Sequence, residues 1–98
     1  MGEYRLSRQT EADLLAIYKA TEEKFGAYQA DAYHAGLERS FGLLADFPRM
    51  GTSADELVAG FRRFRFQSHY IFYTEDTGSI LIRALVHVKM NLRPDLFE

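Results

Sequence analysis

Hydrophobic residues in the first half of the chain recur every three or four positions, which is the spacing of an amphipathic helix. One apolar stripe consists of Leu14, Leu15, Tyr18, Thr21 and Phe25. A second stripe consists of Ala30, Tyr33, Leu37, Phe41, Leu44 and Phe47. The pattern predicts two helices, each of which buries one face.

Residues that typically begin and end helices flank both stripes. Ser7 or Thr10 can cap the first helix, and Thr10 and Asp13 have the spacing of a capping box, with Asp13 in the role of Glu or Gln. Gly26 ends the first helix and Pro48 ends the second. Because only Gly26 separates the stripes, the two helices should form an antiparallel hairpin that needs another layer to cover its apolar faces.

The second half of the chain alternates instead, which predicts strands. Tyr4 to Leu6 already predict one short strand before the helices, and residues 48–59 form a connector. In residues 60–73, Phe64, Phe66, Tyr70 and Phe72 alternate with Arg63, Arg65, His69, Ile71 and Tyr73. In the last strand, one face should carry Ile80, Ile82, Ala84, Val86 and Val88, and the other should carry Leu81, Arg83, Leu85 and His87.

These elements predict a single α+β domain over residues 1–98. Turns at Gln67–Ser68 and Glu75–Gly78 connect the last three strands into an antiparallel meander. The helical hairpin should pack on one face of this small antiparallel β-sheet, with the N-terminal strand nearby. The tail from Lys89 to Glu98 should be irregular or loosely ordered.

Composition excludes several classes of protein and site. The chain has no Cys, which excludes disulfides, thiol catalysis and Cys-based metal sites. A small domain without disulfides is typical of the cytoplasm, and no apolar run is long enough for a signal peptide or a membrane span. We therefore expect a cytoplasmic protein with no membrane partner.

Charge is distributed unevenly along the chain. The formal net charge is −2, which is unusual for a protein that holds nucleic acid by itself, so no direct nucleic-acid binding is expected. Residues 1–60 contain six Lys/Arg and ten Asp/Glu, whereas residues 61–98 contain six and four. The C-terminal part is therefore the basic part of the chain.

Two groups of residues are candidates for a binding surface. Arg62, Arg63 and Arg65 alternate with aromatic residues and could contact an acidic partner, or could be ordinary solvent-exposed strand residues. Arg83 and His87 should share a strand face with Leu81 and Leu85, two apolar side chains that something must cover.

Candidates for catalysis are few. His69 and His87 could act as acid–base groups, although a lone strand His is more often structural. The three His are far apart in sequence, and the chain has no phosphate-binding Gly loop, nucleophile elbow or HExxH motif. The sequence therefore predicts no metal, no cofactor and no catalytic residue.

The order of short motifs resembles the RelE/ParE toxin superfamily, from Tyr4 to about Met90. The matching motifs are Tyr4–Ser7, Ala12–Leu14, Ile17, Gly26, Gln29–Ala30, Tyr33, Leu37, Leu43–Ala45, Pro48, Gly51, Gly60–Arg62, His69–Tyr73 and Ile82–His87. The resemblance is to the ParE branch, whose members poison DNA gyrase and are neutralised by a ParD antitoxin. It implies a toxin that acts by binding and has no active site of its own.

The resemblance also implies where partners bind. The C-terminal segment of the antitoxin would lie across the hairpin and the sheet. The candidate contacts for antitoxin or target are Arg62, Arg63, Arg65, His69, Tyr73, Leu81, Arg83, Leu85 and His87. An acidic disordered tail that folds on a basic, partly apolar surface would gain both charge pairing and burial.

Two alternatives stay open. The RelE branch cleaves messenger RNA on the ribosome, and Arg83 and His87 lie where its acid–base and charge-stabilising side chains could be. A toxin fold that only binds its antitoxin is the third hypothesis. The chain also departs from the family pattern, because Asn91 stands where many relatives carry an acid and the tail beyond Leu92 is short.

Overall fold

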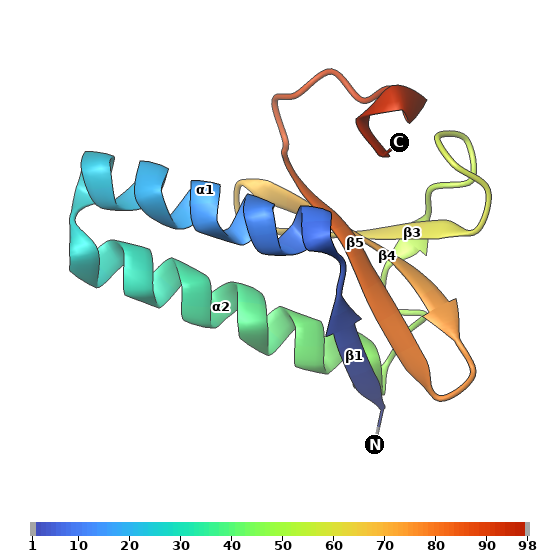
Figure 1. The fold of residues 1–98 in the computed structure, drawn as a ribbon. Coiled ribbons are helices and arrows are strands. Elements are labelled where there is room, and N and C mark those ends of the chain that lie inside the picture. The colour runs from blue at the N-terminus through green and yellow to red at the C-terminus, as the bar shows by residue number, and fades with distance from the viewer. Residues whose placement is uncertain (1, 98) are drawn as a thin grey trace.

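Two long helices cover one face of a five-stranded sheet in the computed structural model, which describes residues 2–97 (Figure 1). The elements are β1 (Glu3–Leu6), α1 (Arg8–Phe25), α2 (Ala27–Asp46), β2 (Thr52–Ser53), β3 (Phe61–Phe66), β4 (His69–Asp76), β5 (Ser79–His87) and the 3₁₀ turn η1 (Pro94–Phe97). The predicted α+β class and the hairpin of helices are confirmed.

The ends of the helices lie where the sequence signals place them. Ser7 is the cap of α1, since its side chain accepts the backbone N–H of Thr10 at 3.0 Å. Gly26 joins the helices with φ +90°, a backbone conformation that favours glycine. Phe47 terminates α2 directly before Pro48. The hairpin therefore turns over one residue, and its two helices run side by side (Figure 1).

The sheet has the strand order β1-β5-β4-β3-β2. The predicted antiparallel meander of β3, β4 and β5 is confirmed. β1 pairs with β5 in parallel, so the whole sheet is mixed, and the two-residue strand β2 extends it at the other edge. β1 is the edge strand, and the chain passes through both helices and two strands of the meander before β5 pairs beside it in the same direction.

The sheet separates two apolar clusters. The larger one lies under the helices and contains Phe41, Leu44, Ile71, Ile80 and Ile82, among others. The smaller one lies on the face away from the helices, which we call the far face, and is centred on Phe61, Phe72, Ala84 and Val86. Both faces of the sheet are therefore buried at its centre.

The C-terminal tail takes part in the smaller cluster. Leu92, Leu96 and Phe97 pack against it, and the Phe97 ring lies 4.7 Å from the Phe72 ring. Figure 1 shows this red segment passing over the sheet on the side opposite the helices. The tail was expected to be loosely ordered, but up to Phe97 it serves as the second covering layer; Glu98 lies outside the described residues.

The two-residue turn between β3 and β4 decides which aromatic side chains face the helices. It pairs Phe66 with His69, so Phe64 and Phe66 face the helices whereas Tyr70 and Phe72 face away. The predicted grouping of these four aromatics on one face is wrong. Residues paired across the two-residue turn share a face, so even-numbered residues that face the helices before the turn face away from them after it.

A glycine of α2 lies close to a side chain of the sheet. A Cβ added to Gly36 would overlap the tip of the Phe66 ring, whereas a Cβ on Gly42, in the same helix, would meet nothing within 4 Å. Gly36 therefore sets the distance between helix and sheet, and Gly42 does not.

We expect opposite effects from the same substitution at these two positions. Gly42→Ala should stabilise the protein by about 0.5–1 kcal/mol through helix propensity. Gly36→Ala should destabilise it by about 1–3 kcal/mol, because overpacking outweighs that gain. Denaturant unfolding of both variants measures the difference, and an equal stabilisation by both would contradict the close approach.

Candidate functional site

The residues predicted to form one binding surface are divided by the structure among four places. Arg63, Arg65 and Arg83 lie on the far face. Leu81 also faces this side, between the helix-facing Ile80 and Ile82. The remaining five predicted residues lie in the core, against the connector or on the helix side.

On the far face, arginines lie against aromatic rings. The Arg63 guanidinium lies 5.5 Å from the Tyr70 ring centroid and 3.6 Å from the Glu56 carboxylate. Arg65 is more exposed and its Nε donates to the Gln67 carbonyl at 2.8 Å. These contacts limit the motion of both cationic groups.

A β-bulge at Arg83 places Arg83 and His87 on opposite faces of the sheet. Tyr73 pairs with Ile82 and Phe72 pairs with Ala84, so Arg83 is an extra residue in β5. Its guanidinium lies 5.1 Å from the Phe61 ring on the far face, whereas His87 is on the helix side. The prediction that Arg83 and His87 share a face is wrong, because the bulge reverses the alternation after Ile82.

The bulge also changes the environment of the apolar residues that follow it. Ala84 and Val86 belong to the far-face cluster, and Leu85 belongs to the cluster under the helices. Leu85 is only 6% exposed, and Tyr73 on β4 is fully buried. Neither side chain is accessible to a partner in this conformation, contrary to the prediction that they form part of a contact surface.

Tyr73 and Arg62 hold the connector between α2 and β2. The Tyr73 hydroxyl donates to the Pro48 carbonyl at 2.7 Å and accepts the Gly51 N–H at 3.1 Å. Arg62 donates to the carbonyls of Arg49 and Gly51. Both side chains satisfy backbone groups of an irregular segment, which is a structural role.

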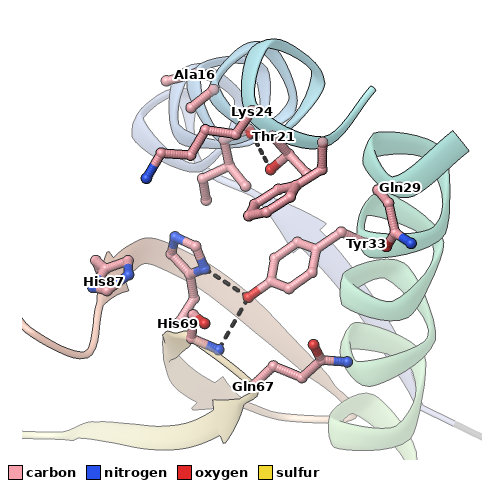
Figure 2. Close-up of a pocket in the computed structure, with 12 residues that line it drawn as sticks. Ala16, Thr21, Lys24, Gln29, Tyr33, Gln67, His69 and His87 are labelled. Atoms are coloured by element: carbon pink, nitrogen blue, oxygen red, sulfur yellow. Dashed lines mark hydrogen bonds between the residues drawn. The ribbon is translucent and has the colours of Figure 1, made fainter. Parts of the chain in front are cut away.

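A groove of about 640 Å³ lies on the helix side of the sheet, at the end of the hairpin that carries its turn. Small residues of α1, Ala16 and Ala20, form part of one wall, and the turn between β3 and β4 closes the floor (Figure 2). The residues that line it are Ala16, Ile17, Ala20, Thr21, Lys24, Phe25, Gln29, Tyr33, Gln67, Ser68, His69 and His87. We call this cavity the hairpin–sheet groove.

Three rings form the polar floor of the hairpin–sheet groove. The Tyr33 hydroxyl lies 2.7 Å from Nδ1 of His69 and accepts the Ser68 N–H at 3.2 Å (Figure 2). The rings of His69 and His87 lie 5.2 Å apart, edge to face. Nδ1 of His87 accepts the Lys89 N–H at 3.1 Å.

Burial sets the protonation of this cluster. Desolvation lowers the pKa of His69, with a smaller lowering from His87 and an opposing effect from Asp13. Desolvation also raises the pKa of Tyr33, and hydrogen bonding with Ser68 offsets part of that rise. At neutral pH the floor therefore holds a neutral imidazole bonded to a neutral phenol.

The sequence indicated His69 and His87 but not the residues that complete the groove. Tyr33 appeared as a member of a helical stripe and of the family motifs, but not as a site residue, although it reaches His69 from 36 positions away. Lys24, Phe25 and Gln29 flank the glycine turn. Lys24 in the last turn of a helix is common for electrostatic reasons alone, so no sequence signal marked these residues as part of a groove.

Comparison with known proteins gives the family. A family model described as "ParE toxin of type II toxin-antitoxin system, parDE" matches residues 4–92. The chain belongs to the ParE toxin family. Toxin ParE1 of Caulobacter vibrioides is 38% identical over 98% of this chain and 99% of its own length. Toxin ParE of Escherichia coli is 33% identical over 100% and 96%.

A solved structure has the same fold as this ParE family member. A chain from the "Chromosomal ParDE TA system from P. aeruginosa" superposes with a TM-score of 0.79 at 20% identity, covering 91% of this chain and 98% of that one. The likeness therefore extends over nearly the whole of both chains. It includes the α+β arrangement of helices on a sheet that forms the hairpin–sheet groove.

Two further observations describe this ParE family member. Among residues 2–97, no group of His, Asp or Glu side chains is arranged to hold a metal ion. Within the same part of the chain, no helix combines the length and the apolarity needed to cross a membrane.

Tyr73→Phe should separate a structural role from a contact role. It leaves the buried N–H of Gly51 unpaired, so we expect a loss of about 1–3 kcal/mol in the free energy of unfolding. Tyr70→Phe, on the far face of the same strand, should change stability by less than about 0.5 kcal/mol. Urea unfolding compares the two variants, and equal losses would contradict the role of the Tyr73 hydroxyl.

The lowered pKa of His69 predicts a dependence of stability on pH. Below the ordinary His pKa of about 6.5, the unfolded chain binds a proton that folded His69 does not, so acidification favours unfolding. Stability should be complete above that pKa and should fall as the pH drops through it. His69→Gln should reduce this loss between pH 7.5 and 5.5, whereas His34→Gln on α2 should preserve it, as measured by thermal unfolding.

Proposed function

We propose that this ParE family member inhibits DNA gyrase by binding it and is neutralised by a ParD-type antitoxin that occupies the hairpin–sheet groove. The groove is the observation that carries the antitoxin part of the proposal. It is open and long enough for several side chains of a bound segment, and its walls come from both the helices and the sheet.

The chemistry of the groove suits an amphipathic antitoxin segment. Ala16, Ile17 and Ala20 form an apolar wall into which aliphatic side chains can pack. Lys24 on the wall and His87 on the floor supply hydrogen-bond donors, which favours carboxylates on the bound segment. Such a segment gains apolar burial along the wall and charge-assisted hydrogen bonds with these donors.

The far face supports the same assignment. Arg63 and Arg83 lie over aromatic rings and Arg65 bonds the Gln67 carbonyl, so their charges are ordered before a partner arrives. An acidic extension of the antitoxin that follows the sheet edge would meet these cations after leaving the groove. Opposite charges on the two partners would also speed their association.

Inhibition by binding, without catalysis, is supported by the separation of the candidate catalytic groups. Arg83 is the cation that could stabilise a phosphorane, and it lies across the sheet from His69 and His87. A nuclease needs its acid–base and charge-stabilising groups around one phosphate. The gyrase target is the role that the ParE resemblance implies.

A second candidate function rests on the pair of imidazoles. His69 and His87 lie 5.2 Å apart in a groove, an arrangement that could transfer protons on both sides of a phosphodiester. It corresponds to the ribosome-dependent messenger RNA cleavage of the RelE branch. His87→Ala should abolish such cleavage if it occurs, and wild-type protein that cleaves no message in a ribosome assay removes this candidate.

The gyrase proposal is tested by induced expression and by purified components. Expression alone should arrest growth with a DNA-damage response, and coexpression of the ParD-type antitoxin should relieve it. Purified protein should stabilise cleaved plasmid in the presence of gyrase and ATP. Growth arrest with falling message levels and intact DNA would contradict the gyrase target.

The antitoxin site is tested by blocking the groove wall. Ala20→Glu places a carboxylate where the proposed partner is apolar or acidic, so we expect at least a tenfold loss of antitoxin affinity, about 1.4 kcal/mol. Ala32→Glu makes the same change at an exposed position of α2 that does not line the groove. Calorimetric titration of both variants with antitoxin should show a loss for the first only.

A further inference from the structure

A second, smaller groove lies between α1 and α2, and the helices alone form it. It has a volume of about 400 Å³ and is lined by Glu11, Leu14, Leu15, Tyr18 and His34. None of these residues lines the hairpin–sheet groove. At about 100° per residue, Leu15 and Tyr18 lie on the side of α1 opposite Ala16 and Ala20. We call this cavity the interhelical groove.

The apolar floor of the interhelical groove is not required by the core. Leu14 is buried beneath it, but Leu15 is 57% exposed beside the half-buried rings of Tyr18 and His34, which lie edge to face at 6.2 Å. A polar residue at position 15 would cost the isolated protein little. A contiguous apolar concavity of this kind on a helical surface is typical of a protein contact.

Acidic side chains surround this floor. Glu11 lines the groove directly, Asp31 accepts a hydrogen bond from the Tyr18 hydroxyl at 2.6 Å, and Glu38 lies 3.5 Å from Nε2 of His34. Residues 8–46 carry four Lys/Arg and seven Asp/Glu. The interhelical groove therefore has an apolar floor and a negative rim, whereas the lining of the hairpin–sheet groove carries the Lys24 cation.

This chemistry defines the occupant. An aliphatic or aromatic anchor fits the floor between Leu15 and Tyr18, and Lys or Arg side chains on either side of that anchor would pair with Glu11 and Asp31. An acidic antitoxin segment would be repelled here. Proteins that hold DNA carry basic surfaces, which are complementary to this rim.

We infer that the interhelical groove is the surface through which the toxin docks on a basic segment of its target, separately from the surface that binds antitoxin. The inference rests on the proposed function, since it takes gyrase as the target. It assigns two roles to two sides of α1: Ala16 and Ala20 face the antitoxin, and Leu15 and Tyr18 face the target.

The closing experiment uses Leu15→Glu and Tyr28→Glu. Both replace an exposed large apolar residue of the hairpin by the same helix-compatible acid, but Tyr28, at 83% exposed, lines neither groove. Each purified variant is assayed for cleaved plasmid with gyrase and ATP, for growth arrest on expression and for affinity to the ParD-type antitoxin. Asp31→Asn, which keeps an acceptor for Tyr18 but removes the charge, is assayed at two salt concentrations.

Leu15→Glu should reduce the yield of cleaved plasmid and the growth arrest at least tenfold. Its affinity for the antitoxin should be unchanged. Tyr28→Glu should match wild type in all three assays. Asp31→Asn should weaken plasmid cleavage at low salt and approach wild type at high salt. Wild-type potency of Leu15→Glu would overturn the inference, as would a parallel loss of antitoxin binding.

The result for the wild-type protein distinguishes a failure of this inference from a failure of the proposed function. If wild type yields no cleaved plasmid with gyrase, the proposed target is wrong, whatever the variants do. Growth arrest then still compares Leu15→Glu with Tyr28→Glu against the actual target. Equal arrest by the two variants would overturn the interhelical groove as a docking surface.

Discussion

The start of α1 is fastened to the exposed backbone of β5, and the placement of every other surface depends on that attachment. β1 pairs with β5 only as far as Ile82, so the backbone beyond that point lacks a neighbouring strand. Ser7 donates to the Arg83 carbonyl at 3.0 Å, Thr10 donates to the Ile82 carbonyl at 2.8 Å, and Asp13 accepts the Leu85 N–H at 2.9 Å. Side chains of the first turns of α1 thus replace the missing strand. They fix the roll of α1 about its axis, and with it the sides on which the two grooves open.

Much of the fold was predictable because its signals are local. Ser7, Gly26 and Pro48 mark helix ends through interactions within a few residues of themselves, and the helical and alternating patterns distinguish helices from strands. The parallel pairing of β1 with β5 was not predictable in the same way, since it joins residues more than 70 positions apart. No local preference of Tyr4 or Arg5 specifies a parallel neighbour.

The candidate site was less predictable than the fold, and the bulge at Arg83 is the main reason. The sequence Ile82–Arg83–Ala84–Leu85 is compatible with unbroken alternation, so nothing in it indicates an extra residue. The bulge is a shift in the pairing register between β4 and β5, and this pairing exists only in the assembled sheet. One register shift moved Leu85 into the core and placed Arg83 and His87 on opposite faces. Tyr73, also predicted as a contact residue, lies in the core, where its hydroxyl holds the connector.

The attachment of α1 to β5 also has a consequence for synthesis on the ribosome. The three bonds span 72 or 76 positions of the chain, so each joins residues that are far apart in sequence. Long-range pairings of this kind form late, after the costly closure of a large loop. While the N-terminal helices emerge, β5 is still being translated, and neither partner of these bonds can find the other. Nascent chains and prematurely terminated fragments that lack β5 therefore have no assembled hairpin–sheet groove, and a translating ribosome carries an incomplete toxin until β5 has been made.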